Sequence, residues 1–428
     1  MASPPGNNNP VGEKHLLLLT TTSGYETRLF VEAAQKLGIP FALGTDRCHR
    51  LDDPWNDGAM ALRFEDPEES AAAILEYARA HPLQAVVPLG DRAVRTAALA
   101  CQALDIPHNP PSAAEACRNK FKARQRLQAA GVWVPPFARF SIDEDPRRCA
   151  GKVPFPCVLK PLSLSASQGV VRADTPGQFV AAFERIAALL RSPEIQVHKE
   201  DTTDWLLAEG FIEGRELALE GLLDRSRLRV LALFDKPDPL DGPFFEETLY
   251  ITPARVDAAT QASIIECVEQ AARALTLFHG PLHAELRLGP AGPRVLEVAW
   301  RSIGGLCSRA LRFRMGLTLP ELILRHAWGL HIDPLVREEA AAGVMMIPIP
   351  RAGVFQGVEG LEDALHTPGV EDITITAKEA HPIVPLPEGS SYLGFIFARG
   401  SSPDAVEQAL RAAHARLRFQ IVPELPVL

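Results

Sequence analysis

The sequence predicts an α/β protein made of several domains, and three observations support this prediction. The chain has 428 residues, which is too long for one compact hydrophobic core and suggests roughly two to four domains. Its first hundred residues alternate strand-like and helix-like segments, which is typical of a parallel sheet covered by helices. Further along, short apolar strands dominate, including a hairpin near residue 290 and a β-rich stretch that starts at Ala341.

In the N-terminal region we expect strands and helices to alternate, in the order strand Leu16–Thr20, helix Glu26–Leu37, strand Phe41–Gly44, helix Ala71–Ala80, strand Ala85–Pro88 and helix Arg92–Leu104. The turn Thr20–Gly24 lacks the G-x-G-x-x-G pattern of dinucleotide sites. It favours a capped turn, or a lip that touches substrate, over a dinucleotide site. Pro107–Ser112 marks a boundary, so we predict a Rossmann-like domain over residues 1–112.

A second domain is predicted over residues 113–330 and a β-rich third domain over residues 331–428. The expected elements are helix Ala113–Ala130, strand Phe155–Pro161, helix Gln178–Leu190, strands Leu206–Phe211, Glu216–Leu223 and Leu228–Phe234, helix Leu319–Gly329 and a terminal helix Pro403–Phe419. Gly131 is the expected end of the first of these helices.

Composition excludes several classes of function. The net charge is −9 and the basic residues are scattered, which disfavours a nucleic-acid partner. Seven cysteines without a C-x-x-C pair fit a reducing compartment, so we expect a cytoplasmic protein. The apolar run Leu16–Leu19 is too short for a signal peptide or a membrane span, so no membrane partner is expected.

The segments Leu282–Leu288 and Pro293–Arg301 are separated by the turn Gly289–Gly292 and predict a hairpin in which Glu285 and Glu297 lie side by side. Adjacent carboxylates repel unless a cation lies between them, and oxygen ligands favour Mg²⁺ over zinc. The alternative is that both are solvent-side charges of an amphipathic hairpin. The glycine pair that follows Arg301 lets the backbone approach an anion closely, and this favours a site.

Two other segments carry weaker signals. Lys160 ends a buried strand, and the loop of hydroxyls and small residues at 162–170 can cover phosphates, although an ordinary hairpin loop would have the same composition. The strand over residues 207–216 bends at Gly214 and can read an adenine edge, although a simple turn explains the glycines equally well.

The order of these segments resembles the ATP-grasp superfamily over about residues 10–330, and most of all its L-amino acid ligases and carnosine-synthase-like ligases. Residues 234–248 resemble the substrate loop of that subgroup, and residues 391–398 resemble its C-terminal domain. The resemblance implies an ATP-grasp fold with a Rossmann-like pre-ATP-grasp domain (1–112), a two-lobed ATP-grasp domain (113–330) with a hinge near 209–214, and a β-rich C-terminal domain.

The resemblance also implies roles for individual residues. Nucleotide binding falls to Lys120 and Lys160 at the phosphates, Ser165, Ser167 and Gly169 in the phosphate loop, Glu209, Phe211 and Ile212 at adenine, and Glu216 at ribose. Glu285 and Glu297 would bind Mg²⁺ (or Mn²⁺), and Arg301 would clamp the acyl phosphate or a substrate carboxylate. Many ATP-grasp enzymes have Asn where this chain has Ala299, so the metal must rely on phosphates and water.

The implied activity is an ATP-dependent carboxylate-amine ligation that forms an amide through an acyl phosphate and releases ADP and phosphate. Lys160 and Arg301 would stabilise the transferring phosphoryl group, and Glu246, Glu247 and His283 are candidates to accept the amine proton. We expect amino acid or other carboxylate substrates and allow for a homodimer. The alternatives are a biotin-carboxylase-like enzyme and a non-catalytic nucleotide-binding protein. Gly304, Gly305 and Ser302 suggest a roomy pocket for the first substrate, which Gly305→Trp would close.

Overall fold

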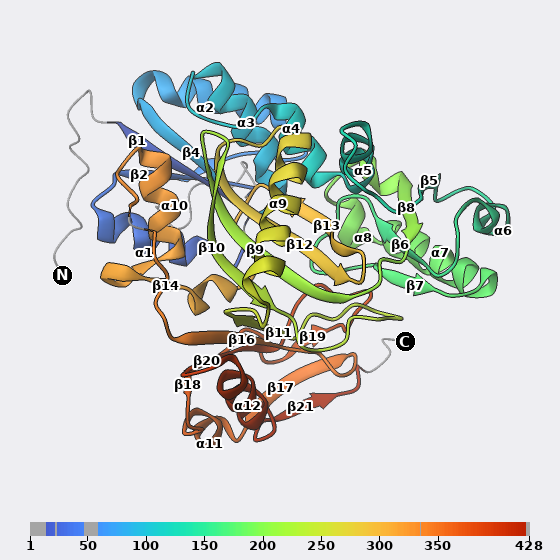
Figure 1. Ribbon diagram of the computed structural model, residues 1–428. Coiled ribbons are helices and arrows are strands. Elements are labelled where there is room, and N and C mark those ends of the chain that lie inside the picture. The colour runs from blue at the N-terminus through green and yellow to red at the C-terminus, as the bar shows by residue number, and fades with distance from the viewer. Residues whose placement is uncertain (1–13, 22–23, 47–58, 334, 425–428) are drawn as a thin grey trace.

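Two four-stranded sheets lie on either side of an eight-stranded sheet, as the blue, green and yellow-green parts of Figure 1 show. This computed structural model describes residues 14–21, 24–46, 59–333 and 335–424. The predicted mixture of helices and strands is confirmed. Among the described residues, no helix is long and apolar enough to cross a membrane.

The N-terminal sheet is parallel and has the strand order β3-β2-β1-β4. Its strands are β1 (His15–Thr20), β2 (Phe41–Thr45), β3 (Met60–Ala61) and β4 (Leu83–Leu89), of which only β3 was not predicted. The chain leaves β1 toward β2 on one side and returns to β4 on the other. The strand order therefore reverses between β1 and β4, which is where folds of this kind bind ligands, beyond the carboxyl ends of the strands.

Three helices cover this sheet: α1 (Thr27–Leu37), α2 (Pro67–Ala80) and α3 (Val94–Ala103). Helix α2 begins four residues before the predicted start. The Asp66 side chain accepts a hydrogen bond from the backbone N–H of Glu69, and Pro67 occupies the first helical turn, where its missing N–H costs nothing.

The single helix expected over residues 113–130 is wrong, because the structure has two helices, α4 (Pro111–Arg118) and α5 (Lys120–Ala129). Asn119 between them is extended (φ −107°, ψ 103°), and its side chain accepts hydrogen bonds of 3.1 Å from the backbone N–H groups of Phe121 and Lys122. This cap starts a new helix. As a result, Lys120 lies at a helix N-terminus and its backbone N–H donates to Leu162 O at 3.0 Å.

The small antiparallel sheet has the order β5-β8-β6-β7. Its strands are β5 (Phe137–Ser141), β6 (Cys157–Pro161), β7 (Val171–Ala173) and β8 (Trp205–Gly210), and its helices are α6 (Pro146–Cys149), α7 (Pro176–Leu190) and α8 (Pro193–Gln196). In the register, Lys160 is opposite Leu207, so Glu209 is its diagonal neighbour on the same face of the sheet.

The large sheet has the order β13-β12-β9-β10-β11-β16-β20-β18. Its strands are β9 (Arg215–Asp224), β10 (Arg227–Asp235), β11 (Leu249–Thr252), β12 (Gly280–Gly289), β13 (Gly292–Ala299), β16 (Ala341–Ile347), β18 (Val370–Ile375) and β20 (Gly394–Gly400), and α9 (Ala258–Ala274) and α10 (Leu319–Trp328) pack against it. Residues 211–214 connect the small sheet to this one. The large sheet continues past residue 330, and the predicted domain limits stay predictions.

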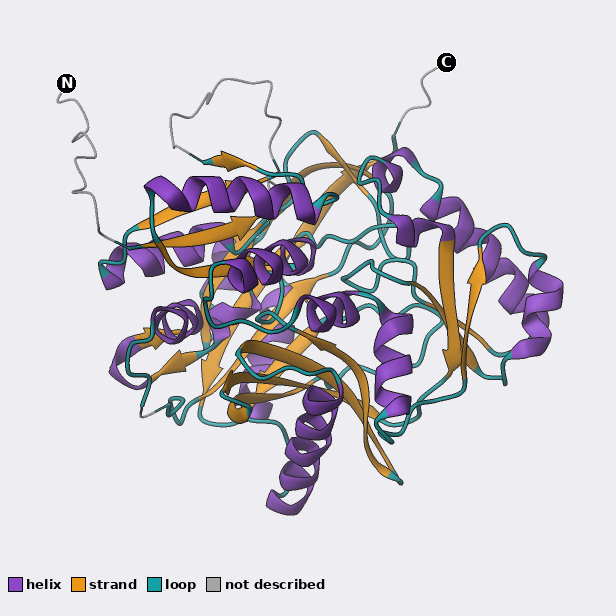
Figure 2. Cartoon of the chain, turned by 90° about the horizontal axis from the view of Figure 1, so that it is seen from above, coloured by secondary structure: helices purple, strands orange, loops and turns teal. Residues whose placement is uncertain are grey.

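The C-terminal region adds β17 (Gly353–Glu359), β19 (His381–Ile383), β21 (Arg418–Val422), α11 (Leu361–Leu365) and α12 (Pro403–His414), and β14 (Arg312–Phe313) pairs with β15 (Leu317–Thr318). The predicted helix 403–419 is therefore too long. It ends at His414, and Phe419 instead lies in β21, opposite Val358 of β17. Figure 2 shows from above how the helices surround the strands of the sheets.

Candidate active site

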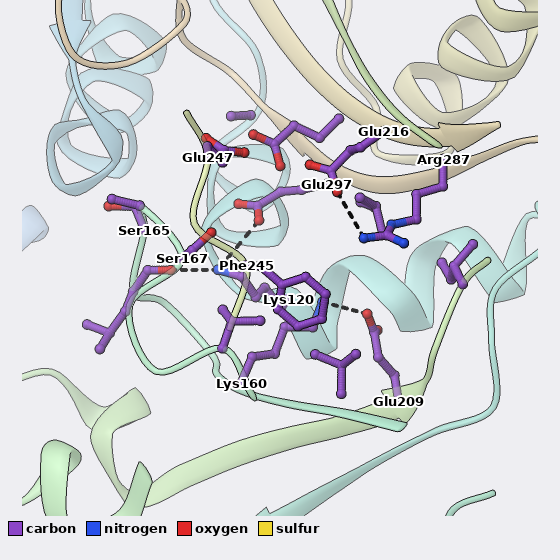
Figure 3. A pocket seen from close by; sticks show the side chains of 18 of the residues that line it. Lys120, Lys160, Ser165, Ser167, Glu209, Glu216, Phe245, Glu247, Arg287 and Glu297 are labelled. Atoms are coloured by element: carbon purple, nitrogen blue, oxygen red, sulfur yellow. Dashed lines mark hydrogen bonds and ion pairs between the residues drawn. The ribbon is translucent and has the colours of Figure 1, made fainter. Parts of the chain in front are cut away.

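A cavity lies between the small sheet and the large sheet, and residues of both sheets line it (Figure 3). Its wall contains most of the residues predicted to bind the nucleotide and metal: Lys120, Lys160, Ser165, Ser167, Glu209, Phe211, Ile212, Glu216, Glu285 and Glu297, together with His283 and Arg301. Segments that are far apart in the sequence are thus brought to one place.

Lys160 belongs to a buried group of three charges. Its Nζ lies 2.5 Å from Oε1 of Glu209, and Arg124 donates to both oxygens of the same carboxylate at 2.7 and 3.0 Å. Burial opposes ionisation of Glu209, yet Arg124 and Lys160 overcome it and lower its pKa to about 2. Arg124, which the sequence did not single out, also donates to the carbonyl oxygens of Val295 and Leu296, so it joins the small sheet to β13.

The phosphate loop predicted at 162–170 forms hydrogen bonds to other segments near both of its ends. Lys120 Nζ donates to Leu164 O at 2.7 Å and lies 3.6 Å from Oε2 of Glu297. Gly169, in contrast, does not line the cavity. Its backbone N–H donates to Pro387 O at 2.7 Å, and a Cβ at this position would lie 2.7 Å from Cγ of Pro161, so close packing explains this glycine.

Phe211 and Phe245 form the apolar part of the wall, with ring centroids 6.4 Å apart. The guanidinium of Arg287 lies 4.8 Å from the Phe211 centroid and 3.4 Å from Glu216. Arg287 is buried and was not predicted. Because Glu216 is also buried, its carboxylate is held by cations of the protein rather than exposed to water.

Glu285 and Glu297 are directly opposite each other in the β12–β13 register, as the hairpin predicted. Their partners differ: Glu297 faces Lys120, whereas Glu285 belongs to a cluster with Glu216 and Glu247 whose ligand atoms all lie within 4.8 Å of one another. Such a set of carboxylate oxygens fits a hard divalent cation. The fold implies ATP binding, and the residues present fit the divalent metal that usually accompanies it.

Lys236 lies among the three carboxylates of this cluster and is the most informative residue that the sequence did not single out. Its Nζ lies 2.7 Å from Glu216 and 3.6 Å from Glu285, and it also pairs with Glu247. Burial disfavours its charge, but the three carboxylates raise the pKa of Lys236 well above its usual range. It directly follows Asp235 at the end of a buried strand, much as Lys160 ends β6, and that parallel could have identified it.

His283 lies between two carboxylates. Its Nδ1 lies 3.0 Å from Glu220 and its Nε2 lies 3.5 Å from Glu285. Burial disfavours the imidazolium, but the hydrogen bonds to both carboxylates raise the pKa of His283 to about 9. A ring that is already protonated cannot accept a proton at neutral pH, so the geometry argues against His283 as the proton acceptor. Glu220 also accepts from the backbone N–H of Ile303.

Of the two neighbouring glutamates, Glu247 lines the cavity and Glu246 does not. Phe245 lines it as well, which is the alternation expected of an extended segment. The structure thus does not bring Glu246 to the site. Burial and the nearby Glu285 raise the pKa of Glu247 to about 7.

A second cavity adjoins the first and reaches the N-terminal sheet. The two share Leu164, Ser165, Ala166, Glu247, His283, Glu285 and Arg301 as lining residues. Arg301 Nε lies 2.7 Å from Oδ1 of Asp91, which follows β4. Of the turn Thr20–Gly24, residues Thr20, Thr21 and Gly24 line this cavity, whereas Thr22 and Ser23 lie outside the described residues.

Gly304 and Gly305 line the second cavity as well. Gly305 has a φ of +64°, and a Cβ there would lie 3.1 Å from Cε1 of Phe395. A tryptophan at this position would strain the backbone as well as fill space. Gly305→Trp therefore cannot separate loss of pocket volume from local distortion, and the expectation of a roomy pocket needs another test.

Three family models match the chain: the ATP-grasp N-terminal domain over residues 31–108, the ATP-grasp domain over 153–310 and the L-amino acid ligase C-terminal domain 2 over 345–422. The crystal structure of an L-amino acid ligase from Bacillus licheniformis superposes with a TM-score of 0.80 at 28% identity and covers 96% of this chain and 99% of that one.

Two curated relatives are similar in sequence. Carnosine synthase 1 of Gallus gallus is 31% identical over 81% of this chain and 39% of its own length, and alanine–anticapsin ligase of Bacillus subtilis is 27% identical over 60% of this chain and 56% of its own length. The chain thus spans 39–56% of these two relatives. The chain belongs to the ATP-grasp superfamily and is a ligase related to the L-amino acid ligases.

Proposed function

We propose that this ligase joins two amino acids, or an amino acid and another carboxylate, into an amide with ATP as the energy source. The observation that carries the proposal is the shared wall of the two cavities. Arg301 and Glu285 face both the nucleotide side and the side next to the N-terminal sheet. A γ-phosphate in the first cavity and a carboxylate in the second would meet at this wall.

The basic residues of the first cavity would bind the phosphates. Lys160 is paired with Glu209 and Lys120 with Glu297, so each ammonium is already held in place before the nucleotide arrives. Arg301 would hold the reacting carboxylate or the acyl phosphate. These groups supply fixed positive charge where negative charge builds up during phosphoryl transfer.

Glu285 and the opposite Glu297 would hold Mg²⁺, and Glu216 offers a further oxygen beside Glu285 in the cluster that these two form with Glu247. The metal would screen the negative charge of the phosphates. Ala299 brings no ligand, which fits a site completed by phosphate oxygens and water.

In the reaction a carboxylate oxygen attacks the γ-phosphorus of ATP, the bond to the β-phosphate oxygen breaks, and ADP leaves. The amine nitrogen then attacks the acyl carbon, the carbon–oxygen bond to phosphate breaks, and phosphate leaves. The nitrogen must give up one proton. Glu247 lines both cavities and has a raised pKa, so we assign it as the acceptor in preference to His283 and Glu246.

The test is ATP-dependent phosphate release by the purified protein with Mg²⁺, screened against pairs of L-amino acids. Release that needs two substrates, and that is lost in Glu297→Ala, would support the proposal. Glu213→Gln is the matched control, because Glu213 is exposed and outside both cavities. Release that survives Glu297→Ala, or that needs bicarbonate instead of an amine, would contradict it.

A further inference from the structure

Glu26 lies in the second cavity and has no role in the scheme above. It directly precedes α1 and follows the turn after β1, so it stands beyond the carboxyl end of that strand. Asp91 occupies the corresponding place after β4 and also lines the cavity. Since the strand order reverses between β1 and β4, both carboxylates stand at the point where ligands bind in parallel sheets of this kind.

The two carboxylates differ in their partners. Asp91 is held by Arg301 at 2.7 Å. Glu26 is only 8% exposed, and within 4 Å it has no ion pair with any Lys, Arg or His of the described residues. Its hydrogen bond comes from Ser302 Oγ, at 3.2 Å. Burial raises the pKa of Glu26 to about 8, and Glu220 and Asp91 add to this while Arg301 opposes it.

A buried carboxylate without a counterion is costly, and a cationic ligand removes that cost. An anion is excluded by charge. A metal ion is disfavoured because the carboxylate cluster found among the described residues with metal-ligand spacing does not include Glu26. An organic ammonium needs a carboxylate that reaches the cavity, and Glu26 offers one.

The surroundings indicate the rest of the ligand. Arg301 offers a positive charge beside Glu26, whose ionisation it favours. Tyr25 and Tyr392 pack against Phe395, with centroids 5.8 and 6.2 Å away, and all three line the same cavity. A carboxylate, an arginine and an aromatic wall match the ammonium, the carboxyl group and the side chain of an amino acid.

We propose that Glu26 binds the α-ammonium group of an amino-acid substrate, so that the N-terminal sheet supplies part of the amino-acid specificity of the ligase. The inference rests on the proposed function for the identity of the substrate class. It goes further in assigning the recognition of the amino group to a residue of the N-terminal region.

The experiment measures binding by calorimetry to the full-length protein loaded with Mg²⁺ and an ATP analogue that cannot transfer its γ-phosphate. The probes are L-alanine, L-leucine and L-phenylalanine, each compared with the carboxylic acid that lacks only the amino group. Wild type should bind at least one amino acid roughly 10-fold or more tightly than its des-amino partner, as a charged hydrogen bond allows. Glu26→Gln should abolish this preference and leave the affinity for the des-amino acid and the nucleotide unchanged.

Glu32→Gln on the same helix is the control, since Glu32 is exposed and pairs with Arg28. A preference that persists in Glu26→Gln, equal binding of both members of every pair by wild type, or no binding of any amino acid would each overturn the inference. So would an equal loss of affinity for both members, which would indicate a structural role. Phosphate release with the same amino acids separates the two proposals. Release without a preference for the amino group would support the proposed ligase function and overturn the role of Glu26. A preference for the amino group without release would support the role of Glu26 and contradict the ligase function.

Discussion

The two adjoining cavities differ in the partners of one buried carboxylate. In the nucleotide cavity each carboxylate has a cation of the protein beside it, as Glu209 has Arg124 and Lys160, and as Glu285 has Lys236. In the second cavity Glu26 accepts a hydrogen bond from the Ser302 hydroxyl and has no ion pair within 4 Å among the residues that the structure describes. The nucleotide cavity is therefore organised before any ligand arrives, and binding there must exchange one counterion for another. In the second cavity a cationic ligand would instead supply the counterion of Glu26.

The largest expected effect on stability comes from removing the carboxylate that Arg124 and Lys160 share in the nucleotide cavity. Glu209→Gln leaves Arg124 and Lys160 buried without their shared counterion, and we expect a loss of about 3–5 kcal/mol in the free energy of unfolding at neutral pH. Denaturant unfolding measures it. The exposed Glu213→Gln should change stability by less than about 0.5 kcal/mol.

The same variant has a defined pH dependence. The folded-state pKa of Glu209 is about 2, below its usual 4.5. Its stabilising contribution is therefore present above pH 4.5 and is lost as the pH falls toward 2. The difference between wild type and Glu209→Gln should shrink over that range, and a difference that is constant down to pH 2 would contradict the ion-pair account.

The next largest effect concerns Lys236. Lys236→Met leaves Glu216, Glu247 and Glu285 together without their cation, and we expect the rate of phosphate release to fall by about 100- to 1000-fold, as on losing a group that stabilises developing charge. The variant should also gain more thermal stability from Mg²⁺ without nucleotide than wild type does. The exposed Lys152→Met is the control. Unchanged rates and unchanged response to Mg²⁺ would refute this role.

A smaller effect on stability is expected for Glu26 in the second cavity. Burial raises the pKa of Glu26 from 4.5 to about 8, so the folded state keeps a proton that the unfolded state releases. The stability from this proton is fully present below pH 4.5 and is lost as the pH rises through 8. Glu26→Gln should have the same melting temperature as wild type at acid pH and a higher melting temperature than wild type above pH 8. Water in the cavity should limit this increase. A variant that melts lower than wild type at high pH would count against an unpaired Glu26.

The smallest effect on stability is expected at the ion pair between Arg185 of α7 and Glu388, which follows the residue that bonds to Gly169 of the phosphate loop. Arg185 and Glu388 form an ion pair that is largely open to water, with Nη2 and Oε2 2.8 Å apart. Glu388→Ala should cost only about 0.2–1 kcal/mol, because solvent screens such pairs. The backbone bond from Gly169 N–H to Pro387 O would remain and hold the loop. A loss of several kcal/mol would show that the segment at Pro387 and Glu388 depends on this pair.

Much of the fold could be predicted because apolar runs and turn residues act locally. Strands β1, β2 and β4 of the N-terminal sheet follow from short apolar runs, and the hairpin follows from alternation on either side of a glycine-rich turn. Helix α9 was missed, although Asp257 caps it and Ile264, Val268 and Ala271 have helical spacing. The break at Asn119 was missed because a capping side chain can start a helix inside a segment whose composition favours one long helix.

The residues of the candidate site also fall into those that local sequence patterns identify and those that they do not. Lys160 and the hairpin glutamates could be identified because each stands at a strand end or in a short-range pattern. Glu220 and Glu26 could not, because their surroundings come from distant segments. Ser302 and Glu26, for example, are 276 residues apart in the chain.

The amino-acid order by itself determined the hairpin that carries Glu285 and Glu297, whereas the register shift between Glu285 and Leu286 is what places the two glutamates opposite each other. The amino-acid order also determined the alternation of strands and helices that builds the parallel sheet. Only the tertiary structure decided which cation each carboxylate pairs with, and that Glu26 forms no ion pair within 4 Å among the described part of the chain. Ionic partners are set by the packing of separate sheets, and no local spacing in the chain encodes the distance between them.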